Sequence, residues 1–244
     1  MGTVFSFAVV TGTLAEAAVR AAIASACEIL HRCDAVFSTW DGASPVSRFR
    51  RGEAALGQMP PEFTEVMREC RAAKQASGGW FDPWAMPGGF DPTGLVKGWA
   101  AERALAELRG AGLAGALING GGDVAAFGSP ADGQRWRVGI RHPWRADALA
   151  CVIEVGQGPA AVATSGPYER GAHLIDPATG EPASRAASAT VTGPSLALAD
   201  ALATGVAVGG DEALAVVAGL DGYAAYLIRP DGSETDTGGI AFVR

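Results

Sequence analysis

The sequence is poor in basic residues and has no run rich in lysine or arginine. Its 19 Lys and Arg stand against 26 Asp and Glu, which gives a formal charge of -7. Because nucleic-acid binding depends on cations that neutralise the phosphates, we expect no nucleic-acid partner. Cysteine and histidine are also scarce, at 4 and 3 residues, with no C-x-x-C pair and no histidine at zinc-ligand spacing. This scarcity predicts free thiols rather than a zinc site.

Signals for export and membrane insertion are missing as well. The sequence has no run of about 18 apolar residues. Met1 leads directly into Gly2–Phe7, without the basic head, apolar stretch and cleavage site of a signal peptide. We therefore expect no integral membrane segment and a cytoplasmic location, although a chain from which a leader had been removed would look the same.

Three common catalytic or nucleotide-binding motifs are also absent. No G-x-G-x-x-G follows the first predicted strand, and neither a P-loop nor a G-x-S-x-G motif occurs. A dinucleotide-binding fold, a Walker-type phosphate loop and serine hydrolysis therefore have no support from the sequence.

The chain does contain enough apolar residues for a large core. Of its 244 residues, 48% are hydrophobic and 18% charged, and no internal repeat or low-complexity linker divides them, so we expect one domain over residues 1–244. Residues 78–94, dense in Gly, Pro, Trp and Phe, are predicted to be irregular. Hydrophobic periodicity predicts helices over 14–36 and 61–77. Further helices are predicted over 94–110, 194–208, which is rich in small residues, and 211–219. Strands are predicted over 3–11, 115–119, 124–127, 135–140, 149–155, 223–229 and 239–243, with two more within 159–193. This order indicates an α+β fold with a mixed, partly antiparallel sheet.

Asp200 and Thr204 are candidate magnesium ligands. They stand four residues apart in the predicted helix 194–208 and so share one face of it. A carboxylate and a hydroxyl are oxygen ligands that Mg²⁺ accepts together with waters, backbone carbonyls and phosphates. A purely structural arrangement explains the spacing too, with Thr204 bonded to a helix carbonyl and Asp200 to a buried donor. The spacing alone favours this structural alternative.

Two glycine-containing segments could approach a ligand closely. Phe90–Gly98 places Asp91, Gly94 and Lys97 at a predicted helix start, where free N–H groups favour phosphate. Asn119–Asp123 closes an apolar strand with three glycines, which remove the Cβ obstacle. Structural turns would explain both segments equally well.

A third segment combines several reactive side chains. Thr164, Ser165, Arg170, His173 and Asp176 fall within a short stretch of predicted loop. Such a density of polar groups is uncommon in loops without a function. His31 lies in an amphipathic helix and His142 in a turn, so His173 is the candidate general base.

Taken together and in this order, the motifs resemble those of the FAD:protein FMN transferases, the ApbE-like flavin transferase family. The resemblance covers nearly the whole chain. It rests on Met1–Thr3, Phe37–Trp40 with Ser47–Phe49, Gly79–Asp82, Asp91–Gly98, Asn119–Asp123, Thr164–Gly166, His173–Gly180 and Asp200–Thr204.

The resemblance implies an α+β fold of two intimately associated lobes with FAD in the cleft between them and Mg²⁺ on its pyrophosphate. Asp200 and Thr204 match the family's side-chain metal ligands, and Gly94 stands at the position of a backbone carbonyl ligand. His173 matches the histidine that activates the acceptor hydroxyl. The residues expected to bind FAD are Met1, Trp40, Trp80, Phe81, Asp82, Asp91, Lys97 and Ile175, with Ser165 from the Thr164–Gly166 motif.

The implied reaction is a magnesium-dependent transfer of FMN from FAD to a Thr or Ser hydroxyl of a partner flavoprotein, with AMP as leaving group. Two alternatives use the same cleft: an FAD pyrophosphatase with water as acceptor, and a non-catalytic FAD-binding protein. The second is motivated by departures from the family pattern, which are Pro45 for Glu, Arg50 for Asn and Trp84 for Thr. Trp40 replaces a common Tyr but keeps an aromatic face.

Overall fold

The computed structural model describes residues 2–131, 133–156, 161–170 and 174–243. The helices are α1 (Glu16–Phe37), α2 (Pro45–Arg50), α3 (Pro61–Ala76), α4 (Thr93–Gly110), α5 (Pro167–Arg170), α6 (Leu196–Gly209) and α7 (Asp211–Ala218), with a 3₁₀ turn at Leu56–Gln58. The strands are β1 (Phe5–Val10), β2 (Gly115–Gly120), β3 (Asp123–Phe127), β4 (Trp136–Arg141), β5 (Leu149–Val155), β6 (Ala161–Ser165), β7 (Ser188–Gly193), β8 (Ala224–Ile228) and β9 (Glu234–Asp236).

Seven strands form one antiparallel sheet in the order β1-β2-β3-β6-β7-β8-β9. The pairing of β3 with β6 brings the start of β3 beside the end of β6, although about 40 residues separate them in the sequence. The remaining strands, β4 and β5, form a separate antiparallel hairpin. The α+β class predicted from the sequence is confirmed.

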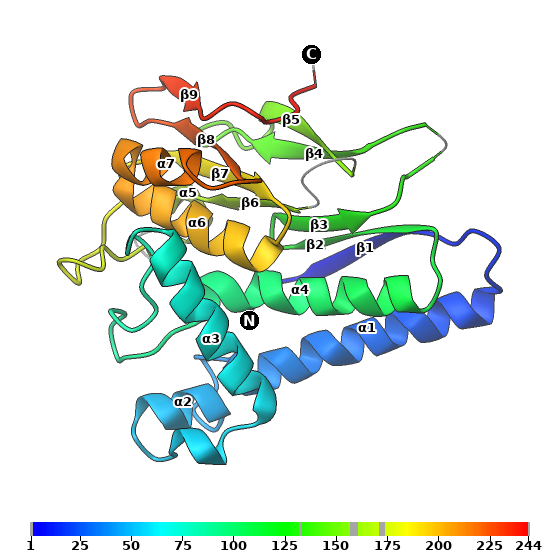
Figure 1. Cartoon of the computed structure of the whole chain (residues 1–244), viewed down its shortest axis with the longest axis horizontal. Coiled ribbons are helices and arrows are strands. Elements are labelled where there is room, and N and C mark those ends of the chain that lie inside the picture. The colour runs from blue at the N-terminus through cyan, green and yellow to red at the C-terminus, as the bar shows by residue number, and fades with distance from the viewer. Residues whose placement is uncertain (1, 132, 157–160, 171–173, 244) are drawn as a thin grey trace.

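The molecule is arranged in layers, with the helices on one face of the large sheet and the β4–β5 hairpin on the other (Figure 1). The helices and the facing side of the sheet bury one extensive apolar cluster. A smaller cluster that includes Val124, Val162, Trp136 and Ile153 fills the space between the sheet and the hairpin. Burial of apolar surface on both faces explains why the strands β3, β6, β7 and β8 are almost entirely buried.

Helix α6 lies inside the helical layer and is made almost wholly of small or apolar residues. It contacts α4, β6 and β7. The approach of α4 depends on Gly98, because a Cβ at this position would lie 2.5 Å from the carbonyl oxygen of Leu196. The side chain of Ser195 accepts a hydrogen bond from Leu198 N at 3.3 Å and so caps the start of α6.

The predicted long helices agree with the structure to within about two residues, but one predicted strand is wrong. Residues 239–243 are not a strand: Phe242 makes a single bridge to Ile153, and the last strand is β9. The physical reason is Gly238 and Gly239, whose φ angles of 81° and 86° turn the chain after β9. The short helices α2 and α5 were not predicted.

No helix in the described part of the chain is both long enough and apolar enough to cross a bilayer.

Candidate functional site

A cavity of about 340 Å³ lies where the start of α4, the middle of α6 and the end of β6 meet. The lining residues are Trp80, Phe81, Asp82, Pro83, Met86, Pro87, Asp91, Thr93, Gly94, Lys97, Ser165, Leu174, Ile175, Asp200 and Thr204. The cavity thus brings together residues that sequence analysis selected from five separate segments.

The α6 wall of the cavity carries the two candidate metal ligands. Asp200 and Thr204 are one helical turn apart and both line the cavity, and Asp200 is only 3% exposed. The hydroxyl oxygens of Thr204 and Ser165 are 3.4 Å apart. On the facing side, a Cβ at Gly94 would lie 3.4 Å from Thr204 Oγ1, so the start of α4 passes close to this hydroxyl.

These groups fit a hard cation better than a soft one. A buried carboxylate, a hydroxyl and a neighbouring backbone are the oxygen donors that Mg²⁺ takes, with waters and phosphates at its other positions. Among the described residues, no group of three or more His, Cys, Asp or Glu side chains could hold a metal ion. The described residues that line the cavity include Asp, Ser and Thr but no His or Cys, so they offer oxygen ligands rather than the nitrogen and sulfur ligands that zinc prefers.

Lys97 supplies positive charge to the same cavity. Its Nζ lies 2.5 Å from Oδ2 of Asp123, a buried residue at the first position of β3. The other carboxylate oxygen of Asp123 accepts a hydrogen bond from Thr164 N at 3.0 Å. Lys97 is thereby held on the cavity wall by a residue of the central sheet, next to the start of α4, where the helix dipole also favours an anion.

Trp80 and Phe81 form an apolar wall. Phe81 N donates to Ser77 Oγ at 3.1 Å, which fixes the turn after α3. Trp80 packs directly on α6, because a Cβ at Gly205 would lie 3.2 Å from Trp80 Cβ and one at Gly209 would lie 2.6 Å from Trp80 Cδ2. Two glycines of α6 thus make the space that this indole occupies.

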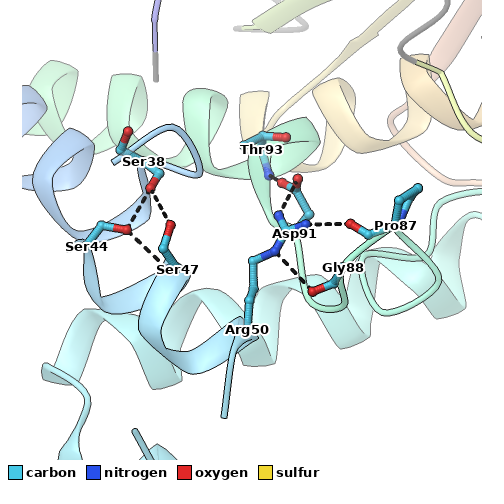
Figure 2. Close-up of polar contacts among 8 residues, drawn as sticks. All are labelled: Ser38, Ser44, Ser47, Arg50, Pro87, Gly88, Asp91 and Thr93. Atoms are coloured by element: carbon cyan, nitrogen blue, oxygen red, sulfur yellow. Dashed lines mark hydrogen bonds and ion pairs between the residues drawn. The ribbon is translucent and has the colours of Figure 1, made fainter. Parts of the chain in front are cut away.

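Residues 82–91, which we call the wall segment, complete one side of the cavity. Asp82 at its start forms an ion pair with Lys74 at 2.5 Å. Asp91 at its end forms an ion pair with Arg50 at 2.9 Å and accepts a hydrogen bond from Thr93 N at 3.0 Å (Figure 2). In the sequence Arg50 stands out only as a departure from the family pattern, because no local signal indicates its contact with this segment.

The other two departures also have structural counterparts. Pro45 is the first residue of α2, where its fixed φ suits a helix start. Trp84 packs against Phe90 with ring centroids 5.2 Å apart, and the guanidinium of Arg71 lies 5.8 Å from the Trp84 ring.

Ile175 reaches the cavity through a tight turn. It makes a bridge with Pro182, and hydrogen bonds between Asp176 N and Glu181 O and between Ala183 N and Leu174 O close the turn. Its neighbour Leu174 lines the cavity as well.

The expected FAD-binding residues that the structure describes line the cavity, with one exception. Trp40 is 85% exposed and lies outside the set that lines the cavity. His173 and Met1 lie outside the described residues.

Comparisons with known proteins bear on the family and the fold of the chain. Residues 1–89 and 86–227 match a family described as the ApbE family. An FAD:protein FMN transferase of Vibrio cholerae is 34% identical over 131 residues, which are 50% of this chain and 39% of that protein. One from Rhodobacter capsulatus is 38% identical over 155 residues, which are 59% of this chain and 29% of that protein. The matched segments therefore span less than half of either relative.

Solved structures share the fold over nearly the whole chain. The flavin transferase ApbE from Vibrio cholerae superposes with a TM-score of 0.81 at 21% identity, covering 99% of this chain and 94% of the other. The ApbE protein from Thermotoga maritima gives the same TM-score at 23% identity, covering 96% and 93%.

Proposed function

The chain belongs to the ApbE family, and on that premise we propose that it transfers FMN from FAD to a hydroxyl group of a partner flavoprotein. The observation that carries the proposal is the convergence of Asp200, Thr204, Gly94 and Lys97 on one cavity with an aromatic wall. This combination of oxygen ligands, a cation and flat apolar surface suits a flavin attached to a pyrophosphate.

The proposed reaction is a magnesium-dependent substitution at phosphorus. A Thr or Ser oxygen of the acceptor forms a bond to the FMN phosphorus, the bond between the two phosphates of FAD breaks, and AMP leaves. The proton of the acceptor hydroxyl passes to a general base, for which His173 is our candidate. The acceptor carries FMN through a phosphoester bond.

The residues of the cavity would share the work of binding. Mg²⁺ would be held by the Asp200 carboxylate, the Thr204 hydroxyl and the Gly94 carbonyl, and when bound it would neutralise charge on the phosphates. Lys97 and the positive end of the α4 dipole supply further positive potential for the pyrophosphate. Trp80 and Phe81 present apolar surface to a ring system and keep water from that side of the cavity.

The test is direct. The protein is incubated with FAD, Mg²⁺ and a candidate acceptor flavoprotein, and the acceptor is examined by mass spectrometry. We expect covalent FMN on one Thr or Ser, no transfer with EDTA present, and no transfer by Asp200→Ala. Asp211→Ala is the matched control, because Asp211 lies exposed on α7 with Arg229 as its partner.

Release of AMP in the absence of acceptor separates the alternatives. Rapid, stoichiometric AMP formation without acceptor would identify a pyrophosphatase instead. Tight FAD binding with no Mg²⁺-dependent turnover would identify a non-catalytic binding protein.

A further inference from the structure

Arg50 is joined to the wall segment by three separate contacts. Its Nη1 lies 2.9 Å from Asp91 Oδ2, its Nη2 donates to Pro87 O at 2.5 Å, and its Nε donates to Gly88 O at 3.3 Å (Figure 2). These contacts link residues 37 to 41 positions apart in the sequence. Pro87 and Asp91 line the cavity, whereas Arg50 does not.

We propose that Arg50 is a positioning residue for FAD binding, which holds the end of the wall segment in place and neutralises Asp91 on the cavity wall. This inference rests on the proposed function for its ligand. It assigns to Arg50 an effect on FAD affinity that is exerted through Asp91 and the 87–88 backbone.

Arg50 can hold the wall segment because its own helix is anchored at the other end. The Ser44 and Ser47 hydroxyls both donate to Ser38 O, at 2.6 and 3.2 Å, and Ser44 Oγ accepts from Ser47 N at 3.1 Å (Figure 2). Pro45 occupies the first position of this capped helix. The start of α2 is therefore tied to the chain leaving α1, and its last residue, Arg50, is presented to the wall segment.

The geometry requires a guanidinium group. Three nitrogen atoms of one planar group contact three oxygens of the wall segment, which the single ammonium of a lysine cannot reproduce. Gly88 makes room for this arrangement, since a Cβ there would lie 2.8 Å from Arg50 Nη2, and its φ of 81° also favours glycine.

The pair also sets the charge of the cavity wall. Arg50 and Asp91 have side-chain exposures of 17% and 20%, so their interaction is less screened than that of a surface pair. Asp91 uses Oδ2 for Arg50 and Oδ1 for Thr93 N. With a neutral residue at position 50, the Asp91 carboxylate would face the phosphates of FAD without its cation, and like charges repel.

The experiment compares Arg50→Gln, Arg50→Lys and Arg51→Gln in the full chain, with FAD as the titrated ligand. We expect roughly tenfold weaker FAD binding and a similarly raised KM for FAD in Arg50→Gln, with kcat within about twofold of the wild type. Arg50→Lys should recover part of the affinity, because it restores the charge but not the three contacts. Arg51→Gln is the matched control, since Arg51 pairs with Glu53 outside the cavity.

Hydrogen–deuterium exchange of peptides covering residues 82–91, measured without FAD, tests whether Arg50 holds the wall segment in place. Faster exchange in Arg50→Gln but not in Arg51→Gln is the expected result. Unchanged exchange, unchanged FAD affinity, or a fall confined to kcat in Arg50→Gln would each overturn the inference. If the wild type itself fails to bind FAD, the proposed function fails with it; if the wild type binds and Arg50→Gln binds equally well, only the role of Arg50 is lost.

Discussion

At the scale of single residues, the ion pair between Lys97 and the buried Asp123 should be costly to disrupt. Asp123 is buried and its two oxygens are engaged by Lys97 Nζ and Thr164 N. A buried carboxylate that loses its cation keeps its desolvation penalty without the compensating attraction. The pair therefore joins α4 to the central sheet as well as charging the cavity.

We expect Lys97→Met to lower the free energy of unfolding by about 3–5 kcal/mol, measured by urea denaturation. Arg20→Met is the control, because Arg20 and Glu16 form an exposed i,i+4 pair whose loss should cost only about 0.3–0.5 kcal/mol. Adding Asp123→Asn to Lys97→Met should recover part of the loss. Equal, small effects of Lys97→Met and Arg20→Met would contradict this account.

Glu102 gives a prediction about pH. Its carboxylate accepts a hydrogen bond from Leu196 N at the start of α6, and burial raises the pKa of Glu102 above its ordinary value of 4.5. Between pH 4.5 and the raised pKa of the folded state, the Glu102 carboxyl is ionised in the unfolded chain but still protonated in the folded chain. As pH rises through this window, Glu102 therefore lowers the free energy of unfolding. The contribution of this group is most favourable below its ordinary pKa.

Glu102→Gln removes that titration and leaves an amide oxygen to accept from Leu196 N. The wild type should lose stability as pH rises from about 4 to about 7, whereas the variant should not. We therefore expect the free energy of unfolding of the variant minus that of the wild type to increase over this range. Urea denaturation across this range measures the difference. A difference that stays constant with pH would show that Glu102 does not titrate in this way.

Some residues of the cavity could be predicted from the sequence, but the long-range contacts that hold them could not. Asp200 and Thr204 were found because four-residue spacing on a helix is visible in the sequence, and the resemblance chose between the two readings of it. The contact of Arg50 with Asp91 joins positions 41 residues apart, and no local pattern predicts it. The partner of Lys97 was missed for the same reason, since only the packing of α4 against β3 brings Asp123 to Lys97.

At the scale of elements, the crossing of α4 over α6 sets the distance between the cavity residues on α4 and those on α6. The backbone of α4 passes so close at Gly98 that a Cβ would lie 2.5 Å from Leu196 O. Leu196 is one helical turn before Asp200, so a displacement at this crossing is passed directly to the candidate metal ligand.

Gly98→Ala should therefore lower the free energy of unfolding by about 1–3 kcal/mol, because the added methyl group forces the helices apart. It should also weaken Mg²⁺-dependent FMN transfer. Gly110→Ala, in the last position of the same helix, has no atom within 4 Å of its added Cβ and should be neutral or stabilising by about 0.5–1 kcal/mol. Thermal and urea denaturation of both variants test this; equal effects would contradict it.

Element lengths explain which helices and strands were predictable. α1 and α3 repeat their apolar spacing over several turns, so periodicity located them, whereas α6 is visible in the sequence as a long run of small and apolar residues. α2 has six residues, too few to show a period, and its signals are only the Ser44 cap and Pro45. The segment 239–243 has the alternation of a strand, but the glycine turn before it leaves only the bridge at Phe242.

At the scale of the whole molecule, the cavity is built by segments from the middle and the last third of the chain. The wall segment, α4, β6 and α6 all contribute. Unfolding separates these segments, so a ligand that contacts all of them binds the folded chain alone and stabilises it by mass action.

We expect FAD with Mg²⁺, at about 100 times the dissociation constant, to stabilise the protein by about 2.7 kcal/mol and to raise Tm by roughly 5–10 °C. Asp200→Ala should remove the part that depends on Mg²⁺ and keep a smaller shift from FAD. Differential scanning calorimetry with FAD alone, Mg²⁺ alone and both together measures these parts. Identical shifts in the wild type and Asp200→Ala would rule out Asp200 as a metal ligand.

The sequence distance between the walls of the cavity also has a consequence for biosynthesis. α4 and the wall segment leave the ribosome well before α6, so a growing chain carries Trp80, Gly94 and Lys97 for some time without Asp200 and Thr204. The proposed FAD site is therefore complete only after the last third of the chain has been translated and packed, which is too late for its ligand to act as an early template for folding.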